Sequence, residues 1–494
     1  MGKPDIVNLS GCVEDTRIAG LDADPGPEDP VNFHLLRGRL QTAKPRIAKI
    51  FIDAAFTPYT NRLDDLGEEE FTQILLSDTT KEGAAGLMID IAQAFLQRGE
   101  RYEPKSRGAF QEVVADLYDG FLGSESRGGV NPPDRETLPP MVKFGNPDFG
   151  PYTWPVDATA SFDLKVGVVN LPPANARHGL LAWPALGHET AGHDILHADN
   201  GLLQEVSNAV RSALAEDPAT EALASYWADR IDETASDVLG ILNMGPAAGI
   251  GLIGYFRGLQ AAFTGRASLR NTGPASDLHP ADILRGFLAA ETVRQLSFAD
   301  AQDWADVLDN ETDKDVGNIN VAGMAVSPDA ARQSARLVSR AIVTHPMLAL
   351  EKHAFGEIQN WRDTDEQIVQ RLRITMATSN PFPADLSSGV FAAHLVSAAT
   401  ISALARGANI SVIFGRMVEL LNGLHDRNPT FGPLRVRHRG DLFRDRAFIP
   451  LDRELEEGKP TFLYAEAEEH VDLVELDKAT KRTSARAERE HKHH

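Results

Sequence analysis

The densest group of chemically active side chains in this sequence lies in residues 187–197, where three histidines and two carboxylates occur together. His188 is followed directly by Glu189, and a second histidine, His193, comes five residues after the first. Imidazole nitrogens bind zinc, and a neighbouring carboxylate can take a proton from a water that the metal activates. The apolar residues 180–186 before the group indicate a buried helix, in which unpaired polar groups would be costly. The segment therefore predicts a metal site for hydrolysis.

The spacing of the histidines leaves two ligand pairs open. Residues four apart on an ideal α-helix are separated by about 40° and residues five apart by about 140°. His193 and His197 have the four-residue spacing and enclose Asp194, whose side chain is one methylene shorter than glutamate. His188 and His193 are five apart and carry Glu189. This second pair requires the extra residue to be absorbed in a π-bulge, a feature found often at functional sites.

A second acidic motif follows in the predicted helix 220–242, where residues 232–237 read Asp-Glu-Thr-Ala-Ser-Asp. Residues 188–193, His-Glu-Thr-Ala-Gly-His, resemble the HExxGH motif of dipeptidyl peptidase III, a zinc peptidase family whose histidines are also five apart. Residues 232–237 resemble the second motif of that family and the ExxxD motif of the wider gluzincin class. Only these two motifs match, and the first acid here is aspartate.

The resemblance implies a zincin-type metallopeptidase with one Zn²⁺ per chain, held by His188, His193 and Glu233. It also implies that Glu189 is the general base and that Asp237 orients a ligand histidine. His197 is then expected to be a neighbour of the site rather than a ligand. His279, in a His-Pro dipeptide, and Arg285 are expected near the catalytic helices, as in several gluzincin families.

The chemistry that follows is hydrolysis of a peptide or other small amide, with Glu189 moving the proton of the attacking water to the leaving amine. A histidine or tyrosine donor would stabilise the oxyanion. Five side chains are candidates for that role: His178, Tyr226, Tyr255, His279 and His394. His394 lies in an alanine-rich apolar helix and is interpreted first as a core histidine or one that lines a cleft.

Two other classes of function remain open. The His193-Asp194 doublet is compatible with an HD-type metal phosphohydrolase, which needs further histidine ligands upstream, where the chain has only His34 and His178. The second is a non-catalytic zincin-like binding protein that has lost turnover. A solvated acidic helix edge is the simplest alternative for Glu233 and its neighbours.

Composition limits the partners. The formal net charge of −22 repels nucleic acid and anionic membrane surfaces, so neither is expected as a partner. Cys12 is the only cysteine, which excludes an intrachain disulfide and is consistent with a reducing compartment.

The N-terminus has no apolar signal-peptide core, and we expect a cytoplasmic protein. Residues 238–256 are uncharged and of membrane-span length, but five glycines and Pro246 predict a buried, broken helix instead.

The predicted fold class is α+β, predominantly helical, around a zincin-like core. The best strand candidate is 162–171, ended by Pro172-Pro173, and helices are predicted at 203–214, 220–242, 281–296 and 389–405. The expected regions are an acidic N-terminal segment (1–32), an N-terminal helical region (33–150), a zincin-like catalytic core (151–300), a C-terminal helical region (301–464) and a charged tail (465–494). The oligomeric state is left open.

Overall fold

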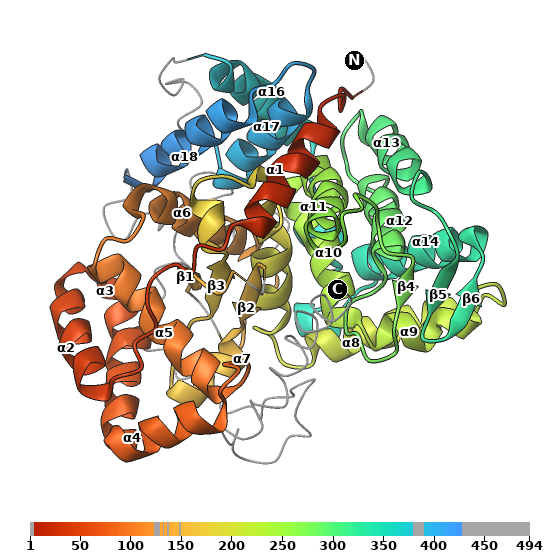
Figure 1. The fold of residues 1–494 in the computed structure, drawn as a ribbon. Helices are drawn as coiled ribbons and strands as arrows, with labels where there is room; N and C mark the ends of the chain where they lie inside the picture. The colour runs from red at the N-terminus through yellow and green to blue at the C-terminus, as the bar shows by residue number, and fades with distance from the viewer. Residues whose placement is uncertain are drawn as a thin grey trace.

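The computed structural model describes residues 4–378 and 390–426, except 123–128, 132, 136–137 and 148–149. The predicted charged tail therefore lies outside the described residues. The described chain is mostly helical, with two small three-stranded sheets, so the prediction of a predominantly helical α+β protein is confirmed. Figure 1 shows the sheet β1-β3-β2 between the helices α2 to α5 on one side and the helices α8 to α14 on the other.

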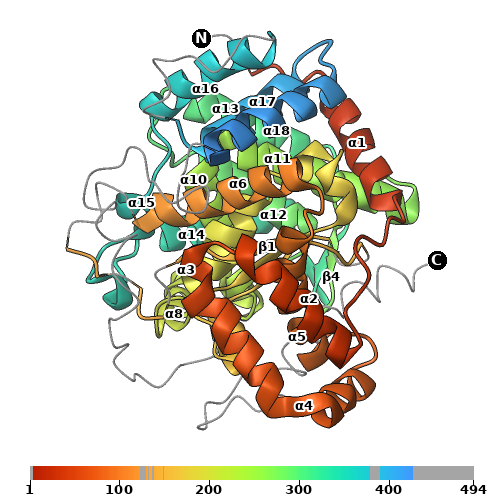
Figure 2. The same cartoon turned by 90° about the vertical axis from the view of Figure 1, so that its left-hand side faces the viewer.

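The N-terminal third supplies helices around this sheet. Their bounds are α1 (Leu9–Leu21), α2 (Phe33–Ala43), α3 (Lys49–Phe51), α4 (Thr57–Ser77), α5 (Ala84–Gly99), α6 (Pro104–Leu122) and α7 (Val156–Thr159). The segment 1–32, which the sequence marks only as acidic, thus contains a helix, α1, which packs against α11 (Pro246–Thr264) far along the chain. Figure 2 shows α2, α4 and α5 together at one end of the molecule, away from α16 and α17.

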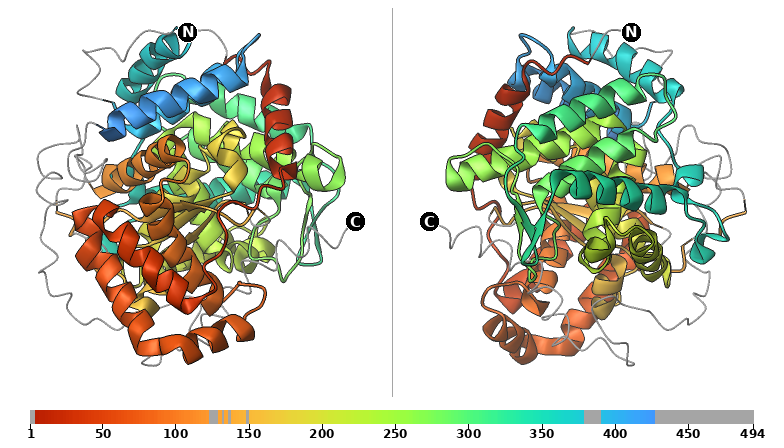
Figure 3. Two further views of the ribbon diagram at one scale, coloured as in Figure 1. Left: turned by 60° about the vertical axis from the view of Figure 1, so that its left-hand side comes forward. Right: turned by 90° about the vertical axis from the view of Figure 1, so that its right-hand side faces the viewer.

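The rest of the chain forms the larger helical part. Its elements are α8 (Leu202–Ala215), α9 (Ala224–Ala228), α10 (Ile231–Met244), α12 (Asp282–Val293), α13 (Ala301–Asp313), α14 (Pro328–Thr344), α15 (Phe355–Ile358), α16 (Asp363–Met376), α17 (Ala392–Leu404) and α18 (Ile410–Asp426). The strands β4 (Thr272–Gly273), β5 (Ile319–Val321) and β6 (Met324–Val326) form the second sheet. Both views of Figure 3 show α1 on the outside of this part.

The first sheet has the order β1 (Met141–Phe144), β3 (Val168–Leu171), β2 (Tyr152–Trp154). β1 runs parallel to β3, whereas β2 runs antiparallel to it. The predicted strand 162–171 is only half right. Asp163 has a left-handed backbone with φ of 61°, which turns the chain, and extended pairing begins at the β-branched Val168.

Of two further predictions for helices, one is wrong and one is confirmed. The predicted helix 220–242 is wrong as one element, because Arg230 leaves the helical conformation between α9 and α10. The Arg230 guanidinium donates to the Tyr226 carbonyl, which replaces a helical hydrogen bond lost at the break, and to the Pro274 carbonyl in the loop before α12. The broken helix predicted over 238–256 is confirmed. Gly245, with φ of 68°, and Pro246 separate α10 from α11.

Helices in the described part of the chain are each too short or too polar to cross a membrane. The buried apolar residues form two clusters. The smaller one joins α2, α4 and α5 to one face of the first sheet, and the larger one runs through α6 and the helices from α8 to α18. The segment 187–194 is buried in the larger cluster against α10, so the two motifs singled out in the sequence lie side by side.

Candidate metal centre

The first motif is π-helical over its whole length, in the element η7 (Gly187–Asp194). A π-helical turn closes hydrogen bonds between residues five apart, so that His188 and His193 lie on the same side of the turn. Glycine allows this turn to approach α10 closely. A Cβ built on Gly192 would lie 2.5 Å from the Cα of Ser236, and one built on Gly240 would lie 2.9 Å from the backbone nitrogen of His188.

This close approach brings the side chains of His188, His193 and Glu233 into one group whose ligand atoms all lie within 4.8 Å of one another. The two Nε2 atoms are 3.1 Å apart. The Glu233 carboxylate oxygens lie 3.3 Å from His188 Nε2 and 3.5 Å from His193 Nε2. Tetrahedral zinc with bonds of about 2.0–2.1 Å places its ligand atoms about 3.3 Å apart. The three side chains therefore fit the ligand set of one zinc ion.

Asp237 orients the first histidine. Its Oδ1 lies 2.8 Å from His188 Nδ1, so that Nδ1 donates a hydrogen bond and Nε2 faces the other two ligands. Arg285 donates to both oxygens of Asp237, from Nε at 2.7 Å and Nη2 at 2.8 Å. Burial raises the pKa of Asp237, but Arg285 and His188 outweigh it and hold the pKa below its usual value. The carboxylate stays ionised at the back of the site.

A longer chain of contacts orients the second histidine. His193 Nδ1 lies 2.9 Å from Asp232 Oδ1, and the other oxygen of Asp232 lies 3.0 Å from His197 Nε2. His197 Nδ1 in turn lies 2.8 Å from Asp157 Oδ2. Burial lowers the pKa of His197, but the two carboxylates outweigh it and raise the pKa to about 10. The structure therefore places His197 outside the ligand group, as a charged partner of Asp232.

The ligand group itself is prepared for positive charge. Burial lowers the pKa of His193, yet Asp232 and Glu233 outweigh it and bring the pKa well above its usual value. Burial raises the pKa of Glu233, but His279 and His193 hold it well below its usual value. The carboxylates of Asp232 and Glu233 therefore favour positive charge at this position.

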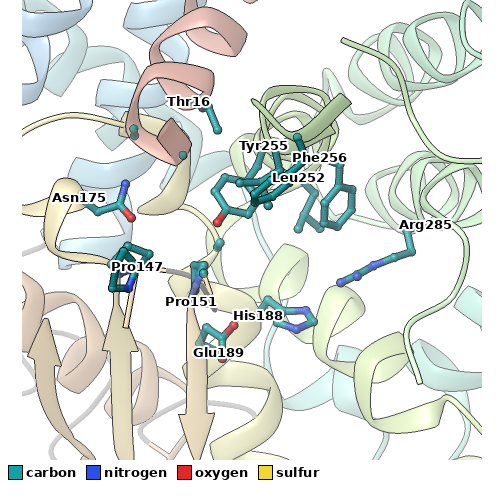
Figure 4. A pocket seen from close by; sticks show the side chains of 17 residues that line it. Thr16, Pro147, Pro151, Asn175, His188, Glu189, Leu252, Tyr255, Phe256 and Arg285 are labelled. Carbon is teal, nitrogen blue, oxygen red and sulfur yellow. The ribbon is translucent and has the colours of Figure 1, made fainter. Parts of the chain in front are cut away.

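Glu189 lies in a pocket beside His188, as Figure 4 shows. Its Oε2 accepts a hydrogen bond of 2.8 Å from the Thr153 hydroxyl, which also contacts the Glu189 carbonyl at 3.1 Å. One carboxylate oxygen is thereby fixed by the edge strand β2. This hydrogen bond links Glu189, next to the first histidine, to a strand 36 positions earlier in the sequence.

The strand that carries Thr153 is itself held from its other face. Tyr152 and Trp154 flank Thr153, and both donate to Asp90 Oδ2 on α5, at 2.6 and 2.8 Å. Asp90 is also ion-paired with the buried Lys143 of β1. Because side chains alternate along a strand, this network fixes which way Thr153 points.

His279 and Arg285 both reach the ligand group. His279 Nε2 lies 3.0 Å from Glu233 Oε1, while its Nδ1 contacts Asp277 at 3.1 Å. Arg285 lies 3.6 Å from Glu233 Oε2 in addition to its pairing with Asp237. Both side chains singled out in the sequence are therefore within the site.

The structure shows which of the five candidate oxyanion donors lie near the site. His178 pairs with Asp22, the Tyr226 hydroxyl accepts from the Ala281 nitrogen, and His394 contacts Asp365 in the core. The polar groups of these three side chains are engaged away from the ligand group, and the contact of His394 agrees with its interpretation as a core histidine. His279 contacts a ligand, and Tyr255 lines the pocket that holds Glu189. Because both ring nitrogens of His279 contact carboxylates, Tyr255 is the candidate donor that remains near the site.

Asp194 is fully buried and lies beside Gly167 rather than in the ligand group. Sequence reasoning missed Thr153, Asp157 and Asp277, which have no recognisable motif. Comparison of the chain with protein-family models, with curated proteins and with solved structures finds no match.

Proposed function

We propose that this protein is a zinc-dependent hydrolase of peptide or other small amide bonds, with a zincin-like core over about residues 151–300. One observation carries the proposal. The π-helical turn brings His188 and His193 together with Glu233 at zinc-ligand spacing, and it leaves Glu189 in the adjoining pocket. The same set is implied by the resemblance of the two motifs to dipeptidyl peptidase III.

Each residue of the site has a separate role. His188, His193 and Glu233 would hold Zn²⁺, which when bound would acidify a water molecule and polarise the scissile carbonyl. Glu189 takes a proton from the attacking water and returns it to the leaving nitrogen as the carbon–nitrogen bond breaks. The Thr153 hydroxyl holds Glu189 Oε2, which leaves Oε1 to move the proton. Tyr255, which lines the pocket beside Glu189, would donate to the oxygen of the substrate carbonyl as negative charge develops there, whereas both ring nitrogens of His279 contact carboxylates.

The pairing of each ligand histidine with a carboxylate supports these roles. Asp237 and Asp232 accept from the Nδ1 atoms, so both Nε2 atoms are free to face the cation. Ligands with such partners are arranged for metal binding, whereas a solvated acidic helix edge would not need Asp237 fully buried beside Arg285.

Metal content and turnover test the proposal together. The purified protein should hold close to one zinc per chain, and it should cleave members of a mixed peptide library, read by mass spectrometry. The substitution Glu189→Gln should lower turnover by about 100-fold or more while zinc remains bound. Glu291→Gln, a substitution of another buried glutamate outside the site, is the matched control and should leave turnover unchanged. Activity that survives Glu189→Gln would contradict the mechanism.

The two alternative classes predict other outcomes. Two metals per chain together with hydrolysis of phosphate esters would favour an HD-type phosphohydrolase, although Asp194 lies apart from the ligand group. Bound zinc without cleavage of any peptide would favour a non-catalytic zincin-like binding protein.

A further inference from the structure

The pocket that holds Glu189 extends away from the ligand group into a space between α1 and α11, and we name it the α1–α11 pocket (Figure 4). Its polar end is formed by His188, Glu189 and Arg285. Its far walls come from Thr16 and neighbouring small residues of α1, from the apolar face of α11, and from loop residues near the first sheet: Pro147, Gly150, Pro151, Pro172 and Asn175. The pocket is therefore continuous with the proposed catalytic site.

The walls beyond the polar end are uncharged and mostly apolar, and the polar side chains of Thr16 and Asn175 there donate to backbone carbonyls. On α11 they include Leu252, Tyr255, Phe256 and Leu259, and among the described lining residues the charged ones are confined to the polar end. The Arg285 guanidinium lies 4.5 Å from the centre of the Phe256 ring and is paired with Asp237, so its charge is already compensated. A charged group entering this space would lose its water without gaining a partner.

The size of the pocket limits what can enter it. Its volume is about 70 Å³, which is room for roughly five to seven water molecules at about 10–15 Å³ each. A leucine side chain has four heavy atoms and a phenylalanine side chain has seven. The pocket ends where α1 packs on α11, since a Cβ built on Gly20 would lie 3.3 Å from Ala262 Cβ and 3.6 Å from Leu259 Cδ2.

We propose that the α1–α11 pocket is the specificity pocket of the enzyme and receives an uncharged apolar side chain, of leucine to phenylalanine size, from the substrate residue next to the scissile bond. The inference rests on the proposed function, because the pocket opens onto Glu189 and His188. It deepens that function by stating the substrate class: peptides or amides with a large apolar residue at the cleavage point.

Binding of amino-acid hydroxamates to the zinc-loaded protein tests this without turnover. Isothermal titration calorimetry would compare the hydroxamates of leucine, phenylalanine, alanine, lysine and aspartate with acetohydroxamate, which has no side chain. Leucine hydroxamate should bind about 50-fold more tightly than alanine hydroxamate, from three additional buried carbon atoms. The lysine and aspartate compounds should bind at least 10-fold more weakly than the leucine compound.

A substitution in the wall provides the second arm. Leu259 is half-buried on α11 and lines the pocket, so Leu259→Asp places a carboxylate there. It should reduce the preference for leucine over alanine to below about 5-fold and should strengthen the binding of lysine hydroxamate. Leu76→Asp, at an exposed leucine of α4, is the matched control and should change neither.

The outcomes separate this inference from the proposed function. Equal binding of all hydroxamates, or preference for a charged one, would overturn the pocket assignment and leave the metal site intact. Tight, side-chain-dependent binding without cleavage of any peptide would support the pocket and contradict the hydrolase. Absence of zinc binding would overturn the proposed function and this inference with it.

Discussion

Replacement of Gly192 by alanine should damage the site through the packing of two helices rather than through any ligand. The new Cβ would lie 2.5 Å from both the Cα and the Oγ of Ser236 on α10. Atoms in ordinary van der Waals contact lie at least 3.4 Å apart, so η7 and α10 must separate by about 1 Å at this point. Rotation of the Ser236 side chain cannot relieve the overlap, because one of the atoms belongs to the backbone.

Two opposing effects set the magnitude. Alanine is more favourable than glycine within a helix by about 0.5–1 kcal/mol. Overpacking in a buried interface typically costs about 1–3 kcal/mol, and an overlap with backbone lies at the upper end of that range. The net loss in the free energy of unfolding should therefore be about 2 kcal/mol. Glu233 lies one helical turn from Ser236, and zinc ligands tolerate shifts of only about 0.2 Å, so zinc affinity should fall at least about 10-fold.

Denaturation of the metal-free protein and zinc titration with a competing chelator measure the two effects. Gly415→Ala on α18 is the matched control, because a Cβ there meets nothing within 4 Å. It should stabilise the protein slightly and leave zinc affinity unchanged. Adding Ser236→Gly to Gly192→Ala should restore part of the loss, since it removes the side-chain atoms of residue 236 and leaves its backbone in place. A Gly192→Ala protein with unchanged stability and unchanged zinc affinity would refute the reasoning.

Three further substitutions follow from buried charges. His197→Gln should remove a pH dependence of the free energy of unfolding. The pKa of His197 is about 10 in the folded protein and 6.5 without its carboxylate partners. The stabilisation by charged His197 is therefore complete below pH 6.5 and is lost as the pH rises toward 10. Asp237→Asn should cost about 3–5 kcal/mol, because Arg285 is left buried without its carboxylate, and it should weaken zinc binding by about 10–100-fold. Lys143→Met should also cost about 3–5 kcal/mol by leaving Asp90 without its cation, and it should lower kcat because β2 loosens.

Urea denaturation of the metal-free proteins at pH 6, 8 and 10 tests the first of these, with His178→Gln as the control for a partly exposed histidine pair. If the wild type and His197→Gln lose equal stability between pH 6 and pH 10, the assignment of a charged His197 is wrong. Wild-type zinc affinity in Asp237→Asn would show that this carboxylate does not orient His188. Unchanged stability in Lys143→Met would mean that the pair with Asp90 has no net effect.

The helical character of the protein is expressed locally, which is why sequence patterns could predict it. Helical periodicity and the five-residue spacing of His188 and His193 are properties of short segments, whereas Glu233 lies 40 residues after His193. The details that failed depend on distant contacts. The break at Arg230 is stabilised by the Pro274 carbonyl, more than 40 residues away, and just after the turn at Asp163 the Lys165 nitrogen donates to the Ala54 carbonyl, more than 100 residues away.

By itself, the sequence determined which residues are able to bind a metal and left two histidine pairs open. Only the tertiary structure decided between their arrangements, because close packing of η7 on α10 at Gly192 is what brings residues five apart to face Glu233. The partners Thr153 and Asp157 were likewise beyond the sequence. Thr153 lies 36 residues before its partner Glu189, and Asp157 lies 40 residues before its partner His197. The direction of the Thr153 side chain depends on the register of β2, and the position of Asp157 depends on burial, so no local pattern shows either contact.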